Sequence, residues 1–297
     1  MRVRVLGSAA GGGLPQWNCG CPNCARARAG DAALPPRAQP SIAVSADGAR
    51  WSLANATPDV REQLARAPAL HPRPGTRDVP IDTVVLTNAD LDHTLGLLVM
   101  REALPHRIVS TPWVRRALLR HNAVFRLLEP AWSEAKLDEP FLLDRGDTLE
   151  ARLFPVPGKP PGWLRDLERN DPETTVGLRV TDRRSGRRLV YAPGVQRLDE
   201  GTLAELAAAD LRFLDGTFWS EHELLAFRPG APSATEMGHV PVSGPGGSLR
   251  LLASLPGRSF YVHLNNTNPL LDARSEQAAA VARASVGVAM DGMEIEL

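Results

Sequence analysis

The most constraining feature of this chain is a group of polar side chains at a predicted strand-to-helix junction. An apolar strand at residues 83–86 runs into this junction. Four side chains that can ligate a metal follow it within one turn: Asn88, Asp90, Asp92 and His93. Acidic residues are also common caps at helix N-termini. Taken alone, the junction is therefore consistent with either a metal site or a capped helix.

Polar residues recur at predicted strand ends in the last third of the chain. Asp215 follows an apolar strand, His239 lies in a turn, and His263 ends another strand. Ligands at the ends of separate strands are how a fold gathers a metal site, so we expect these three to converge on the 88–93 turn. A structural role is the alternative for each histidine. Four histidines have no such context and are assigned no function: His71, His106, His121 and His222.

The three cysteines lie together as Cys19, Cys21 and Cys24. An odd number cannot pair fully in disulfides, and a bond across Cys19 and Cys21 would be strained. The C-x-C-x-x-C spacing instead suits a structural zinc bound by three thiolates, with free thiols in a loop as the alternative. Two residues are candidates for a fourth ligand: Asn266 and Asp272.

Charge and hydropathy exclude several classes of protein. The formal net charge is zero, so no basic excess predicts a nucleic-acid partner and no acidic excess predicts disorder. No apolar run is long enough for a membrane span. The N-terminus enters a strand at residues 1–6 with no apolar signal-peptide core. We expect a cytoplasmic protein, and we leave its oligomeric state open, a homodimer included.

Strand-like runs outnumber helical runs in both halves of the chain. Strands are predicted at residues 1–6, 42–44, 50–53, 83–86, 107–109, 151–154, 176–180, 188–191, 211–214 and 259–262. Hairpin turns are predicted at residues 47–48 and 291–292, both Asp-Gly. Helices are predicted from Thr57-Pro58 to residue 65 and at residues 91–104, 114–128, 202–209, 248–254 and 275–284. The fold class is α/β, with two packed sheets flanked by helices in preference to a doubly wound parallel sheet.

A segment rich in Pro and Gly extends from residue 155 to 173. It contains Lys159, one of only two lysines in the chain, and Trp163. A loop of this length is typical of a lid over a site, and a disordered surface insertion is the alternative. As a lid, it would place Lys159 and Trp163 against the substrate.

Several motifs resemble known families. The 88–93 turn resembles the H-x-H-x-D-H signature of the metallo-β-lactamase superfamily, with Asn88 and Asp90 in place of the two leading histidines. The chain further resembles the pyrroloquinoline quinone (PQQ) biosynthesis protein B family over essentially its whole length. The motifs that carry this resemblance are GSAAGGGLPQWNC at residues 7–19, DLDHTLGLL at 90–98, VPGK at 156–159, DGTFW at 215–219, MGH at 237–239 and HLNNTNP at 263–269.

The resemblance implies one metallo-β-lactamase-like αββα sandwich over residues 1–297, with two mixed β-sheets flanked by helices, a zinc knuckle at 17–26 and a lid loop at 155–173. It implies a role in making PQQ from a precursor peptide, by iron- and O₂-dependent hydroxylation of the tyrosine of a Glu-Tyr fragment. A carrier that moves PQQ or its precursor toward the periplasm, and a metal-dependent hydrolase, are the alternatives. The implied catalytic residues are Asn88, Asp90, Asp92, His93, Asp215, His239 and His263.

The residue types narrow the choice of active-site metal. A hydrolytic di-zinc site needs several imidazoles, but the first turn offers one imidazole and three oxygen ligands. Adding His263 makes two histidines plus carboxylates, which resembles the two-His-one-carboxylate set of Fe(II) oxygenases. We therefore predict Fe(II), with Mn, Mg or Zn as alternatives, held by Asp90, Asp92, His93 and His263. Asn88 would be a hydrogen-bond donor at this site, and Asp215 a further ligand or a partner of one.

Overall fold

Two seven-stranded sheets form the centre of the structure, a computed structural model that describes residues 1–102 and 106–297. In spatial order, the first sheet contains β14 (Glu294–Glu296), β1 (Arg2–Gly7), β2 (Ser41–Ser45), β3 (Trp51–Ala54), β4 (Ile81–Val85), β5 (Arg107–Ser110) and β6 (Trp132–Glu134). The second contains β13 (Gly287–Val288), β12 (Arg258–Val262), β11 (Leu211–Asp215), β10 (Arg188–Ala192), β9 (Val176–Asp182), β8 (Leu149–Pro155) and β7 (Phe141–Leu142).

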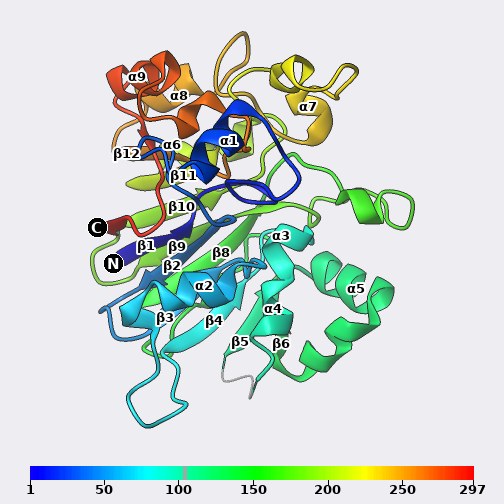
Figure 1. Cartoon of the computed structure of the whole chain (residues 1–297). Helices are drawn as coiled ribbons and strands as arrows, with labels where there is room; N and C mark the ends of the chain where they lie inside the picture. The colour runs from blue at the N-terminus through cyan, green and yellow to red at the C-terminus, as the bar shows by residue number, and fades with distance from the viewer. Residues whose placement is uncertain (103–105) are drawn as a thin grey trace.

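Helices cover the outer face of each sheet (Figure 1). On the second sheet lie α1 (Pro22–Arg28), α6 (Glu200–Ala207), α8 (Leu249–Ser254) and α9 (Glu276–Arg283). On the first lie α2 (Val60–Ala65), α4 (Gly96–Val99) and α5 (Pro112–His121). Shorter pieces near the site are α3 (Leu91–Thr94), α7 (Ala234–Met237) and the 3-10 turns η3 (Gly162–Leu164), η4 (Glu223–Ala226) and η5 (Pro269–Leu271); η1 (Pro68–Leu70) and η2 (Ala123–Ala131) complete the set. The predicted αββα sandwich, with two mixed β-sheets flanked by helices, is confirmed.

Strand β10 shows why the central strands read as unbroken apolar runs. Leu189 and Tyr191 pack into the core between the sheets, whereas Val190 and Ala192 pack under the helices. Successive side chains of a strand point to opposite faces, and here both faces are covered. Strand β10 therefore has no polar face.

Both sheets are mixed, and their parallel strands place the site. The parallel pairs run from β3 to β6 in the first sheet and from β10 to β13 in the second. Ligand sites in α/β sheets form beyond the carboxyl ends of parallel strands. A bridge between Ala9 and Leu264 ties the two sheets together at this end, beyond β1 and β12. The loops after β4, β11 and β12 therefore meet at one edge of the sandwich.

Two predicted helices are divided in the structure. The helix predicted at residues 91–104 is wrong as one element, because α3 ends at Thr94 and α4 at Val99; residues 103–105 lie outside the described part. Between them, Ala56 donates to the carbonyl of His93 and accepts from the N–H of Gly96, at 2.8 and 2.9 Å. The helix at 114–128 is likewise divided at Asn122 into α5 and η2.

Two predicted boundaries are also corrected. Asp47-Gly48 does turn between antiparallel β2 and β3, but the hairpin predicted at Asp291-Gly292 is wrong. That turn joins β13 of the second sheet to β14 of the first, so its flanking strands never pair. Helix α2 starts at Val60, later than predicted, because Thr57 caps a preceding turn by accepting from the N–H of Asp59. In the described ranges, no helix is long and apolar enough to cross a membrane.

Candidate functional site

Three side chains from two strand ends converge at the edge of the sandwich. Asp92 and His93 lie in α3, directly after β4, and His263 follows β12. One potential ligand atom from each lies within 4.8 Å of the others. Asp92 Oδ2 is 3.3 Å from His263 Nε2 and 3.7 Å from His93 Nε2, and the two imidazole rings meet edge to face at 5.4 Å. This spacing matches an ion held by two nitrogens and one oxygen at about 2.0–2.2 Å each.

Two threonines orient these imidazoles. Thr217 Oγ1 lies 2.6 Å from Asp215 Oδ1, which can only accept, so the hydroxyl proton goes to Asp215. The same oxygen, 2.8 Å from His263 Nδ1, then accepts from that ring. Thr87 Oγ1 donates to the amide oxygen of Asn55 at 3.1 Å, so at 3.2 Å from His93 Nδ1 it can accept from that ring. A hydrogen bond at Nδ1 sets the tautomer, so both rings present Nε2 to the cluster.

The electrostatics of the cluster fit a bound cation. His93 Nε2 is buried and has no hydrogen-bond partner, and burial lowers the pKa of His93 to about 4, so this ring is neutral at pH 7. Burial also acts to lower the pKa of His263, but the carboxylate of Asp92 shifts it upward overall. In the tautomer that Thr217 selects, His263 Nε2 and Asp92 Oδ2 are two acceptors in contact. A proton or a metal ion must lie between them, and only a metal ion also gives His93 Nε2 a partner.

Asp215 and His239 form a second group that shares His263. One ligand atom of each lies within 4.8 Å of the others, and the rings of His239 and His263 stack at 5.3 Å. Asp215 is fully buried, and its Oδ2 accepts from the N–H of Val195 at 2.8 Å and from His239 Nδ1 at 2.7 Å. Burial acts to raise the pKa of Asp215, but His239 outweighs it and the net shift is downward. Because both its oxygens accept hydrogen bonds from protein groups, Asp215 is better placed to orient histidines than to ligate.

Asn88 and Asp90 form a hydrogen-bonded pair beside the cluster. Asn88 Nδ2 donates to Asp90 Oδ2 at 2.7 Å, and the N–H of Asp90 donates to Asn88 Oδ1 at 3.0 Å. Burial, and then repulsion from Asp92, raises the pKa of Asp90 to about 7. Both residues line the site cavity, but the converging ligand set in the described ranges contains Asp92 and not Asp90.

A cavity of about 780 Å³ opens over the cluster. The predicted lid loop forms one part of the wall, through residues 158–162 and Arg165, and α7 forms another part beside it. Lys159 lines this cavity and donates to the backbone carbonyl of Glu236. Trp163 does not line it; its indole donates to the carbonyl of Ala89 at 3.1 Å. Trp163 therefore anchors the loop to the 88–93 turn, in place of the predicted substrate contact.

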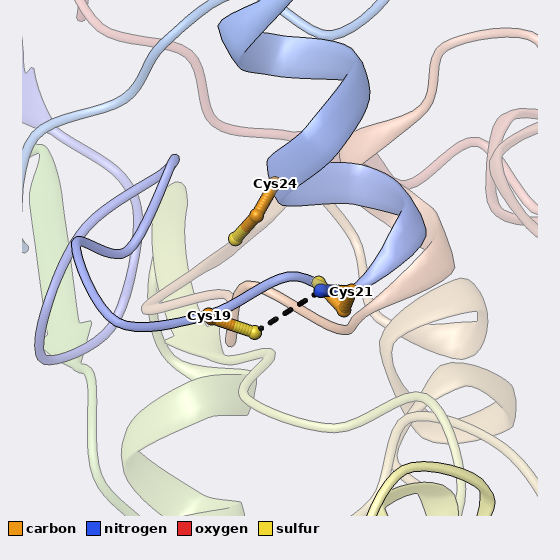
Figure 2. Close-up of side chains that lie close together, drawn as sticks. All are labelled: Cys19, Cys21 and Cys24. Carbon is orange, nitrogen blue, oxygen red and sulfur yellow. Dashed lines mark hydrogen bonds between the residues drawn. The ribbon is translucent and has the colours of Figure 1, made fainter.

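The three cysteines lie together at the start of α1 (Figure 2). Cys19 and Cys21 are on the preceding loop and Cys24 is on the helix, with their sulfurs within 4.8 Å of one another. The side-chain amide of Asn266 lies 3.0, 3.5 and 3.4 Å from the sulfurs of Cys19, Cys21 and Cys24. The other fourth-ligand candidate, Asp272, is instead paired with Arg26 at 2.7 Å.

Sequence reasoning missed three residues of the site: Thr87, Thr217 and Arg165. Thr217 lies inside the DGTFW motif and Thr87 directly precedes the 88–93 turn, but a hydroxyl gives no sign in the sequence that it will orient a histidine. Arg165 follows Lys159 in the same loop, and its proximity to the cavity depends on how that loop folds. The four histidines given no function lie outside both ligand groups and are not among the cavity-lining residues.

Comparisons with known proteins show which proteins this chain resembles. A family model described as a beta-lactamase superfamily domain matches residues 50–263. Proteins named coenzyme PQQ synthesis protein B are 46% identical in Methylobacterium nodulans and 41% identical in Azotobacter vinelandii, each over 100% of both chains. A crystal structure of zinc-bound PqqB from Methylobacterium extorquens superposes with a TM-score of 0.94 at 42% identity, again over 100% of both chains. A diphosphatase of the PhnP family, at 20% identity and a TM-score of 0.68, shares the fold.

Proposed function

We propose a specific reaction for this chain, which belongs to the coenzyme PQQ synthesis protein B family and takes part in the biosynthesis of PQQ. The proposed reaction is the iron- and O₂-dependent hydroxylation of the tyrosine ring in a Glu-Tyr fragment of the precursor peptide. One oxygen atom of O₂ is inserted into an aromatic C–H bond, and the other is reduced to water by two electrons from an external reductant together with two protons from the solvent. The substrate is a peptide or an amino-acid-derived precursor.

The observation that carries this proposal is the set of two imidazoles and one carboxylate at the cavity floor. His93 Nε2 is buried without a partner, and it faces the same carboxylate oxygen as His263 Nε2. Two histidines and one carboxylate with open positions are typical of non-haem Fe(II) oxygenases. Iron bound there would supply the one-electron chemistry that O₂ needs to react with an organic ring. The crystal structure of the Methylobacterium extorquens relative contains bound Zn²⁺, which supports metal binding by this chain.

The surrounding residues would position the substrate. The hydrogen-bonded pair of Asn88 and Asp90 faces the cavity and would bind the phenol hydroxyl of the tyrosine. Asp215, through His239 and Thr217, would keep His263 in the ligating tautomer. The loop at residues 155–173 would act as the lid that excludes bulk water. The roles of Asn88 and of Thr217 each depend on hydrogen bonds of one side chain, so a single substitution can remove each of them.

At the cysteine cluster we propose a structural zinc held by three thiolates. Asn266 would complete the site, because its amide already lies against all three sulfurs and rotation of the amide presents Oδ1 as a ligand. A closed tetrahedral site contributes folding energy and no open position for chemistry. This zinc would fix the loop before α1 to the Asn-rich turn that follows His263.

The test is oxygen consumption by the full chain loaded anaerobically with Fe(II), given a reductant and the Glu-Tyr fragment. We expect O₂ uptake and a product heavier by one oxygen atom, neither of them with zinc- or manganese-loaded protein. His93→Ala should abolish both, whereas His71→Ala, an exposed histidine outside the site, should not. The hydroxylase proposal fails if iron-loaded protein consumes no O₂ with any tyrosine-containing fragment. Tight PQQ binding without turnover would then favour a carrier, and cleavage of a phosphodiester would favour a hydrolase.

A further inference from the structure

Two cations from one loop line the site cavity. Lys159 and Arg165 both come from the loop between β8 and β9, and both line the cavity. The Lys159 side chain lies along Gly238 at the end of α7, where a Cβ added to the glycine would lie 3.2 Å from Cε of the lysine. This contact and the bond to the carbonyl of Glu236 hold the ammonium group on the cavity wall.

No carboxylate is paired with either cation in the described part of the chain. Lys159 donates to a backbone carbonyl, and the guanidinium of Arg165 has no hydrogen bond or ion pair. The nearest acidic side chain on α7, Glu236, already accepts from the N–H of Ser233 in a capping box at 2.8 Å. Other arginines of the chain do find partners, such as Arg187 with Asp210 at 2.5 Å and Arg274 with Asp31 at 2.7 Å.

The two positive charges are close enough to interact. Burial and then the charge of Arg165 lower the pKa of Lys159. The carboxylates of Asp90 and Glu236 act in the opposite direction on the pKa of Lys159, but neither forms an ion pair with Lys159 or Arg165. Like charges that face one cavity raise the free energy of the free protein, and an anionic ligand relieves this cost. Guanidinium groups bind carboxylates through two parallel hydrogen bonds, and a lysine binds as a point charge. The pair therefore has the chemistry of a site for two anionic groups.

We propose that Lys159 and Arg165 together form a two-cation site that binds carboxylates of the substrate, and that this chain selects ligands with at least two carboxylates. The proposal rests on the proposed function, because it takes the ligand from the Glu-Tyr-derived intermediates of PQQ synthesis. The carboxylates bind at the two cations, and the aromatic ring extends toward His93 and His263, which line the same cavity. Arg165 thereby becomes a specificity-determining residue at the rim of the cavity.

Binding of PQQ itself, a tricarboxylate, to the full chain tests this directly, followed by fluorescence quenching or calorimetry. Loss of a charge-assisted hydrogen-bonded pair at this rim should weaken binding about tenfold. We expect that loss for both Arg165→Gln and Lys159→Gln. Arg169→Gln is the matched control, because Arg169 is an exposed arginine of the same loop that does not line the cavity; it should change the Kd less than twofold. Arg165 is exposed and makes no side-chain bond, so its variant should fold normally.

Competition identifies the anion. Glutarate should displace PQQ from the wild-type chain about tenfold better than butyrate, and Arg165→Gln should remove most of this difference. The proposal is overturned if Arg165→Gln binds PQQ as tightly as Arg169→Gln does, or if inorganic pyrophosphate competes better than glutarate. Oxygen uptake distinguishes a failure of the hydroxylase proposal from a failure of the two-cation site. Arg165-dependent binding without O₂ uptake contradicts the hydroxylase alone, whereas O₂ uptake with an unchanged Kd and KM in Arg165→Gln contradicts the two-cation site alone.

Discussion

Replacing Thr217 by valine should weaken metal binding without removing any ligand. Valine has nearly the shape of threonine, so the buried site keeps its packing and loses only the hydroxyl. That hydroxyl donates to Asp215 Oδ1 at 2.6 Å and accepts from His263 Nδ1 at 2.8 Å. Without it, the buried Nδ1–H of His263 lacks its acceptor, and the ring is free to adopt the tautomer that directs a proton toward the metal.

The size of the effect follows from these contacts. Hydrogen-bond partners of ligating histidines typically change metal affinity by about ten- to a hundredfold, which corresponds to roughly 1.4–2.7 kcal/mol. The buried, unsatisfied donor should also destabilise the fold by about 1–3 kcal/mol. Thr217→Ser restores the hydroxyl and should recover most of both losses.

Competition with a chelator of known affinity measures the metal Kd, and ¹⁵N chemical shifts of the imidazole report the tautomer of His263. Thr202→Val is a matched control, because Thr202 is a buried threonine whose hydroxyl has no hydrogen-bond partner; it should leave the metal Kd unchanged. The reasoning is refuted if Thr217→Val binds metal as tightly as Thr217→Ser and the tautomer of His263 does not change.

Three further predictions concern the same network and the elements that support it. His93→Ala should lose the active-site metal and all oxidation activity, whereas Asn88→Ala should keep the metal and lose about ten- to a hundredfold in kcat/KM. Metal analysis and O₂ uptake measure these two effects. Equal metal loss in both variants would contradict the assignment. Cys21→Ser should lose one zinc per chain and lower Tm by roughly 5–10 °C with the active-site metal retained, checked by metal content and calorimetry, and an unchanged zinc content would rule out the knuckle. Burial raises the pKa of Glu223 to about 7, above its unfolded value, so its stabilising effect is complete below about pH 4.5 and is lost as the pH rises through 7. Glu223→Gln should remove about 2 kcal/mol of this pH-dependent loss of unfolding free energy, after a discount for the partial exposure of the side chain. Denaturant unfolding at pH 5 and pH 8 would detect the difference. If variant and wild type lose the same stability between the two pH values, the prediction is wrong.

Local sequence was most informative where burial is uniform. The runs that became β2, β4, β9, β10, β11 and β12 were predicted within two residues at their ends, because strands covered on both faces are mostly apolar. The Asp47-Gly48 hairpin followed from turn chemistry alone. The predicted helix boundaries were wrong where a distant backbone segment forms the hydrogen bonds that a continuous helix would form within itself. Ala56 does this between α3 and α4. The Asp291-Gly292 turn has hairpin chemistry, but its flanking strands join different sheets.

The sequence by itself determined the strand pattern, the motifs of the family and the types of side chain that can form the site. Only the tertiary structure decided which of those side chains meet. It brought Asp92, His93 and His263 together, turned Asp90 toward Asn88, placed Asn266 and not Asp272 at the cysteines, and set Arg165 beside Lys159 at the cavity. These outcomes depend on contacts between residues up to 247 positions apart, and no local propensity records the partner that a side chain meets across two packed sheets.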